Sequence, residues 1–186
     1  MDELVQLMEQ LRTHLPVGWE QLPDFPLYMD QVLSYMDRQV LRFEDDDGLT
    51  AAMVNNYTKG GLVPRAEGKK YNQEHLAYLT VICILKRVMS AKDMSVTLEA
   101  QLRQQPSVQA GYERFRTSLS EAMNRIADEM ERFPDEEQVA DAAVRFALMS
   151  YAAGLASSYY VARLRETAAP APTKNKKASR AKKEEL

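Results

Sequence analysis

A pair of adjacent glycines between two helical stretches constrains the fold of this chain more than any other feature. Residues 51–59 have helical character, and Thr50 is a suitable N-cap because its hydroxyl can accept from an amide of the first turn. Gly60 and Gly61 end this helix, since glycine readily takes the left-handed conformation found there. Asn72 then caps a second helix that is apolar on most sides. The pattern predicts a short helix, a reversal and a buried helix in succession.

The residues between these helices favour a β-hairpin. Two short extended pieces, 62–65 and 69–71, are separated by Ala66-Glu67-Gly68, which suits a tight turn. The order helix, loop, helix, hairpin, helix is typical of a winged helix-turn-helix, in which the second helix enters the major groove and the hairpin reaches neighbouring phosphates. The sequence therefore predicts a mostly α fold: a winged helix-turn-helix with a small β-hairpin wing, followed by a C-terminal α-helical region.

One resemblance follows from these residues. In MerR-type regulators the recognition helix runs into the wing as I-R-Y-Y-E-R-x-G-L-L, and residues 54–63 here read VNNYTKGGLV, followed by Pro64 and Arg65. The stretch therefore resembles a MerR-like winged helix-turn-helix, which implies DNA binding. It departs from that pattern at Asn55 and Asn56, where neutral amides replace Arg-Tyr.

A second resemblance covers more of the chain. Three stretches carry it: LPDFPLYMDQVLSYMDRQ, NNY with the following Gly-Leu, and KKYNQEHLAYLTVICILKRV. Together they are similar to the bacterial domain-of-unknown-function family 1836, over most of residues 20–165. That resemblance implies a suspected transcriptional regulator.

The candidate DNA contacts lie on the short helix and in the hairpin. They are Thr50, Asn55, Asn56, Tyr57, Lys59, Arg65, Lys69 and Lys70. The cations suit phosphate contacts, which position a protein without reading sequence. An asparagine can read adenine through two hydrogen bonds, but it can equally be a polar residue on a solvated face. Tyr57 is either an anchor in the core or a groove contact.

Charge limits how nucleic acid could be bound. The net charge is −3, but residues 167–186 hold six Lys or Arg and two Glu, so residues 1–166 have a net charge of −7. Attraction of DNA must therefore come from local patches, such as residues 50–75 with a net charge of +2, or from the basic tail. The acidic residues 44–47 would be repelled by phosphates, so this loop points away from DNA or the motif binds something else.

The C-terminal half predicts helix pairing. Apolar residues from Val108 to Phe133 recur at steps of three and four, the seam of a long helix that meets a partner. A last helix runs to about Arg165, and its uncharged stretch, 146–162, is shorter and more polar than a membrane span requires. We expect a helical hairpin that dimerises or shelters an effector, and no membrane insertion. The predicted divisions are 1–26 (N-terminal helix and irregular connection), 27–106 (winged helix-turn-helix), 107–166 (helical hairpin) and 167–186 (disordered basic tail).

Little in the chain suits catalysis. His14, His75 and the single Cys83 form no metal-ligand spacing and no nucleophile and base pair, so we expect no catalytic residue, no metal, no cofactor and no enzyme activity. One cysteine and an acidic start without a secretory pattern predict a cytoplasmic protein. The expected function is a homodimeric transcriptional regulator that binds double-stranded DNA, with an unidentified effector. The alternative is a non-catalytic protein-interaction or ligand-sensing helical module that retains the winged-helix shape without specific DNA binding.

Overall fold

The computed structural model describes residues 2–41, 48–133 and 136–167, and these ranges form seven α-helices and two short 3-10 helices. The α-helices are α1 (Asp2–Thr13), α2 (Met29–Met36), α3 (Ala51–Lys59), α4 (Gln73–Leu85), α5 (Ala91–Arg103), α6 (Val108–Met130) and α7 (Val139–Thr167). The 3-10 helices are η1 (Trp19–Gln21) and η2 (Glu136–Gln138). The mostly α expectation is confirmed.

Side-chain caps explain where four of the helices begin. The Thr50 hydroxyl accepts from the Met53 amide at 3.2 Å, and the Asn72 side chain accepts from the His75 amide at 3.2 Å. Ser90 and Ser107 cap α5 and α6 in the same way. Each cap satisfies an amide of the first turn that has no partner inside the helix. The predicted starts of α3 and α4 are confirmed.

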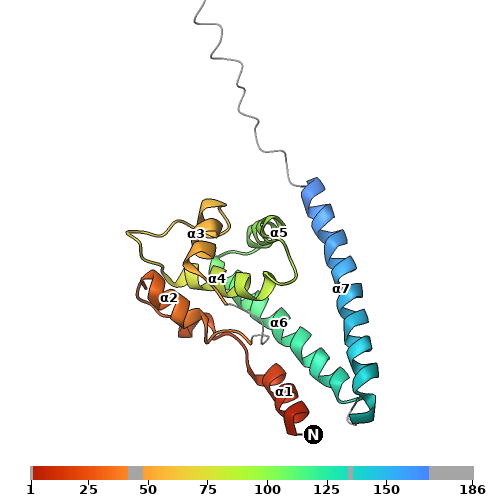
Figure 1. The fold of residues 1–186 in the computed structure, drawn as a ribbon. Coiled ribbons are helices and arrows are strands. Elements are labelled where there is room, and N and C mark those ends of the chain that lie inside the picture. Colours follow the sequence, from red (N-terminus) through yellow and green to blue (C-terminus); the bar gives the residue numbers. More distant parts are fainter. Residues whose placement is uncertain (1, 42–47, 134–135, 168–186) are drawn as a thin grey trace, which may run out of the picture.

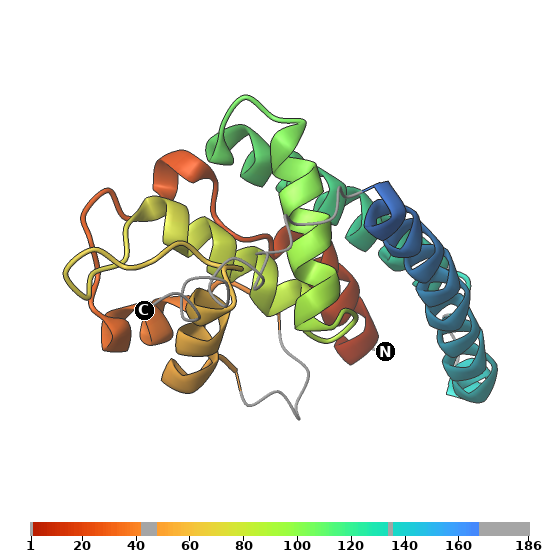
Figure 2. The ribbon, with the colours of Figure 1, turned by 90° about the horizontal axis from the view of Figure 1, so that it is seen from above.

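The core surrounds α4, which lies between α2, α3 and α6 (Figures 1 and 2). Leu76, Leu79 and Ile82 of α4 are fully buried, together with Met36 of α2 and Val54 of α3. The Thr80 hydroxyl, also fully buried, donates to the Leu76 carbonyl at 2.9 Å, so this polar group is satisfied inside the helix. Burial on most sides of α4 explains why its sequence is apolar all round.

The apolar seam of α6 is covered by α4 and by α1, which runs along it (Figure 1). At the exposed end of this pair, Arg12 of α1 donates to Asp128 at 2.8 Å and to Glu131 at 2.7 Å. The long α7 lies at the outer edge of the molecule and contacts α5. The seam of α6 is therefore covered by two helices that precede it in the chain, α1 and α4, and the predicted pairing of residues 107–166 as a helical hairpin stays a prediction.

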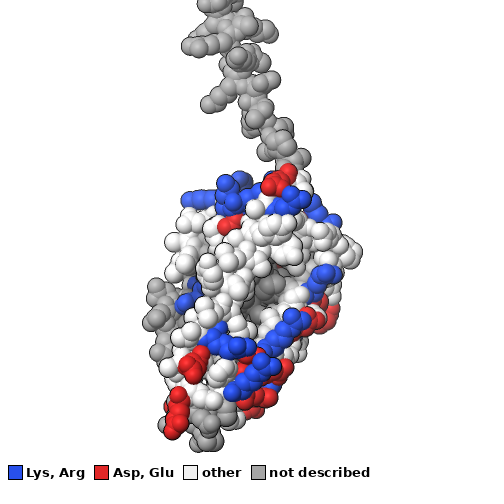
Figure 3. Space-filling model, turned by 90° about the vertical axis from the view of Figure 1, so that its right-hand side faces the viewer, with Lys and Arg blue, Asp and Glu red and all other residues white. Residues whose placement is uncertain are grey.

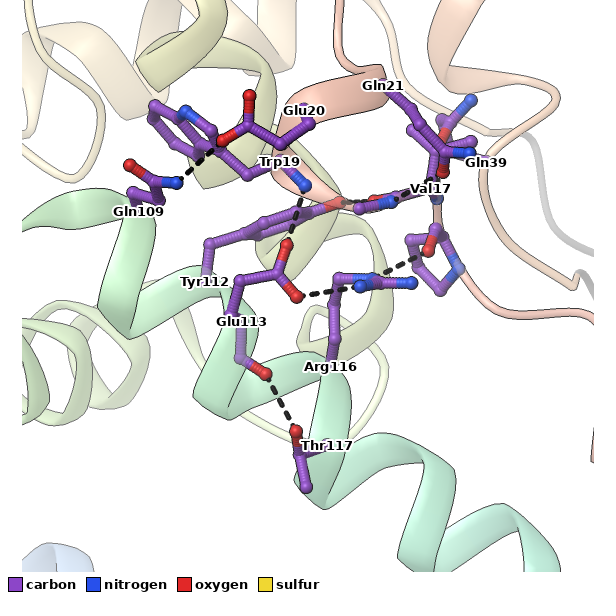
Figure 4. Close-up of polar contacts among 12 residues, drawn as sticks. Val17, Trp19, Glu20, Gln21, Gln39, Gln109, Tyr112, Glu113, Arg116 and Thr117 are labelled. Carbon is purple, nitrogen blue, oxygen red and sulfur yellow. Dashed lines mark hydrogen bonds and ion pairs between the residues drawn. The ribbon is translucent and has the colours of Figure 1, made fainter.

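A group of polar contacts holds the segment that follows α1 against α6 (Figure 4). The Glu113 carboxylate accepts from the Trp19 amide at 2.6 Å and from the Arg116 guanidinium at 2.7 Å. Arg116 also donates to the Pro16 carbonyl at 2.8 Å. Burial alone would raise the pKa of Glu113, but these hydrogen bonds and the charge of Arg116 lower the pKa below its ordinary value.

Tyr112 forms a second set of contacts between the same two segments. Its hydroxyl donates to the Val17 carbonyl at 2.8 Å, and its ring lies edge-on to Trp19, with 6.3 Å between the ring centroids. Burial raises the pKa of Tyr112 to about 12. The residues that precede α2 are thus held against α6 by both polar and aromatic contacts.

The prediction of a β-hairpin wing is wrong. The residues that the structure describes contain no β-strand, and 60–71 form a loop with isolated bridges at Glu67–Lys70 and Leu27–Tyr71. The Glu67–Lys70 bridge closes a tight turn in which Gly68 and Lys69 have φ angles of 56° and 66°.

The two predicted extended pieces pair elsewhere instead of with each other. The amides of Leu62 and Val63 donate to the Tyr57 carbonyl at 2.9 and 3.3 Å, and both side chains enter the core. Tyr71 exchanges hydrogen bonds with Leu27, at 2.8 and 2.9 Å. Since no ladder forms beyond the turn, the fold is not a winged helix-turn-helix with a β-hairpin wing.

Candidate nucleic-acid interface

The short helix α3 is anchored by one face and exposes the other. Val54 is fully buried against the core, whereas the next two side chains, Asn55 and Asn56, are exposed. Thr50 begins the helix through its capping bond, so its hydroxyl already has a structural role. The arrangement presents two adjacent amides to solvent on a helix whose position is fixed.

Tyr57 is placed differently from the two asparagines. Its side chain is half-buried and packs against the core, and burial raises the pKa of its hydroxyl. Its carbonyl also holds the turn that follows α3. The structure therefore supports the core-anchor interpretation of Tyr57.

The four candidate cations are all exposed. Lys59 ends α3, and Arg65, Lys69 and Lys70 follow in the loop of residues 60–71. The Lys70 ammonium lies 5.2 Å from the centre of the Tyr28 ring, just before α2, a distance at which cation and ring attract. Both α3 and this loop lie on the side of the molecule away from α7 (Figures 1 and 2).

His75 supports the loop from α4. Its side chain is buried, its Nδ1 accepts from the Asn72 amide at 3.1 Å, and its Nε2 lies 3.3 Å from the Arg65 carbonyl oxygen. The ring also packs edge-on against Tyr71 at 5.4 Å between centroids. The sequence pattern offered no signal for this role, since the partners of the ring are largely backbone atoms.

Two other expectations bear on this surface. The acidic residues 44–47 lie outside the described residues, so their direction relative to α3 stays open. In the ranges 2–41, 48–133 and 136–167 no three His, Cys, Asp or Glu side chains gather closely enough to hold a metal ion.

The helix α7 is long and apolar enough to cross a membrane by length and composition alone. Its most apolar stretch is not buried within the protein. The expectation that it does not insert into a membrane stays a prediction.

Comparison with known families gives one match. Residues 17–115 match a family described as "Domain of unknown function (DUF1836)". No curated protein and no solved structure matches the chain. These comparisons give no support to the MerR resemblance. The family match covers more than half of the residues, and the chain therefore belongs to the DUF1836 family.

Proposed function

We propose that this protein binds double-stranded DNA through α3 and the loop of residues 60–71, as a transcriptional regulator. The observation that carries the proposal is the exposure of Asn55 and Asn56 on an anchored helix that leads directly into a loop with exposed cations. A helix of this kind can place side chains against base edges, while cations beside it neutralise phosphates. The proposal assigns no catalysis to the chain, and it places the protein in the cytoplasm.

The two groups of side chains have separable tasks under this proposal. Lys59, Arg65, Lys69 and Lys70 contact phosphates, so they supply affinity that falls as salt rises. With four such contacts the slope of log K against log salt is roughly −4. Asn55 and Asn56 contact bases, and each correct pair contributes about 1 to 3 kcal/mol of discrimination.

The experiment is fluorescence anisotropy with the DNA upstream of the protein's own coding sequence, against a scrambled duplex, over a salt series. The double variant Lys69→Asn, Lys70→Gln should weaken binding to both duplexes and reduce the salt slope by roughly 2. Asparagine is chosen for position 69 because it tolerates the left-handed backbone found there. Lys92→Gln on α5 is the matched control and should leave binding unchanged.

Asn55→Ala and Asn56→Ala should weaken binding to the specific duplex and leave binding to the scrambled duplex unchanged. Equal affinity of the unchanged protein for both duplexes at low salt would contradict the proposal. Binding that survives both sets of variants but is lost when residues 167–186 are deleted would assign it to the basic tail instead.

A protein-interaction or ligand-sensing module is the second candidate function. The net charge of −7 over residues 1–166 favours it, because such a body repels a polyanion beyond the local patch. The same anisotropy series separates the two candidates, since this module predicts no preference for the specific duplex.

A further inference from the structure

A cavity of about 240 Å³ lies where the end of α1 meets α4 and α6. Its walls are mostly apolar, with side chains from Leu11, Val40, Ile84, Leu119 and Met123. An engineered apolar cavity of about 150 Å³ binds benzene, so a space of this size holds a molecule of roughly ten non-hydrogen atoms. A concave, mostly apolar surface with a few polar groups is typical of a small-molecule site.

His14 brings to this wall a polar group that has no partner. Its amide donates to the Gln10 carbonyl at 2.8 Å, which continues the last turn of α1 and holds the residue in place. Its Nε2 is buried and has no hydrogen-bond partner among the described residues. Leaving a buried polar atom unsatisfied costs free energy, so a ligand hydroxyl group that bonds to Nε2 would remove this cost.

A cation lies at the opening of the cavity. Arg87 and Val88 are the exposed residues of its wall, and Val88 also borders a hollow between α5 and α7. Figure 3 looks onto the side that carries α7 and shows a hollow among uncharged side chains, with basic side chains beside it. A guanidinium has five N–H donors, so that of Arg87 can bind a ligand carboxylate while it keeps a contact within the protein.

We propose that this cavity binds a small hydroxylated aromatic acid. The ring lies against the apolar walls, the hydroxyl group donates to Nε2 of His14, and the carboxylate lies at Arg87. A rigid ring fills such a space at a lower cost in conformational freedom than a flexible chain. The two polar ends of the ligand thus match a buried nitrogen and an exposed cation. The proposal does not depend on DNA binding, and it is compatible with either candidate function.

Calorimetric titration of the full chain with three compounds tests the class of ligand. Para-hydroxyphenylacetate should bind with a dissociation constant on the order of 100 μM. Phenylacetate lacks the hydroxyl group and para-hydroxyphenethyl alcohol lacks the charge, and each should bind roughly fivefold more weakly. Absence of binding at millimolar concentration would overturn the proposal. Equal affinity for either comparison compound would overturn the contact with the group that this compound lacks.

Substitutions in the wall test the two polar contacts separately. His14→Leu should reduce the affinity for para-hydroxyphenylacetate to that for phenylacetate, which should itself stay unchanged. Arg87→Gln should abolish the preference for the acid over the alcohol, whereas Arg114→Gln, an exposed residue of α6, is the matched control and should keep it. A hydroxyl preference that survives His14→Leu would overturn the role of Nε2. The comparison of compounds on the unchanged protein does not require any variant to fold.

The single cysteine, Cys83, tests the location because it lines the cavity and is 6% exposed. Para-hydroxyphenylacetate at ten times its dissociation constant should slow the reaction of Cys83 with methyl methanethiosulfonate roughly tenfold, since only the unliganded protein reacts. Met123→Trp fills the cavity and should abolish binding, whereas Glu121→Trp, exposed on the same helix, should leave binding unchanged. Binding without protection of Cys83, or binding retained in Met123→Trp, would overturn the proposed site.

Discussion

The clearest energetic prediction concerns Glu113, the carboxylate that joins α6 to the segment before α2. It accepts two charge-assisted hydrogen bonds, from the Trp19 amide and from Arg116, and its side chain is 41% exposed. Such bonds contribute about 1.5 to 3 kcal/mol each when shielded, and exposure to solvent reduces this to about 1 kcal/mol. Glu113→Ala should therefore lower the free energy of unfolding by about 2 kcal/mol. Glu113→Gln keeps an acceptor for the Trp19 amide and should cost about half as much.

Urea unfolding followed by circular dichroism and by the fluorescence of Trp19, the single tryptophan, measures both variants. Glu121→Ala, an exposed residue of the same helix, is the matched control and should change stability by less than about 0.5 kcal/mol. If Glu113→Ala and Glu121→Ala cost the same, the contacts of Glu113 contribute nothing and the reasoning fails.

The effect of Glu113 should also depend on pH. The pKa of Glu113 is lower in the folded protein than the ordinary value of 4.5. At a pH near these pKa values the folded state therefore binds fewer protons than the unfolded state. The stabilisation is complete above about pH 5 and is lost as the pH falls through the folded-state pKa. The difference in stability between the unchanged protein and Glu113→Gln should accordingly shrink in acid. A difference that stays constant from pH 7 to pH 3 would refute the electrostatic part of the explanation.

Two further predictions concern the local geometry of the candidate interface. Thr50→Ala removes the cap of α3 and should cost about 1 kcal/mol in urea unfolding, while Thr50→Ser should cost much less; equal losses would show that the hydroxyl does not cap the helix. Gly68→Ala should cost about 1 kcal/mol because φ is 56°, although the added methyl group meets only open space, and Gly68→Asn should cost less; if alanine is tolerated without loss, the turn has a different backbone.

Local side-chain chemistry explains what the sequence predicted well. Thr50 and Asn72 act on amides three residues away, so the starts of α3 and α4 are encoded within one helical turn. The exposure of Asn55 and Asn56 likewise follows from their positions on a single short helix. The assignment of these residues to DNA stays a prediction.

Contacts between separate segments explain which features the sequence did not predict. The turn at Gly68 and Lys69 is local. The expected wing has no ladder because Tyr71 forms its backbone hydrogen bonds with Leu27, and the amides of Leu62 and Val63 donate to the Tyr57 carbonyl. The residue pattern within 60–71 does not reveal that these backbone groups bond to partners outside the expected hairpin. The periodicity of α6 shows that a face exists and leaves open which helix covers it. The bond between Glu113 and Trp19 has no signature in either segment.

The family match ends at Phe115, within the first half of α6, while the helix continues unbroken to Met130. The ties at Tyr112 and Glu113 hold the early turns, so the direction in which the chain leaves the matched region is set before the match ends. A 23-residue helix is about 35 Å long and behaves as a stiff rod over that distance. Another helical protein joined in register after Met130 would therefore be held at a defined angle to the core, which makes α6 a natural splice point for rigid fusions.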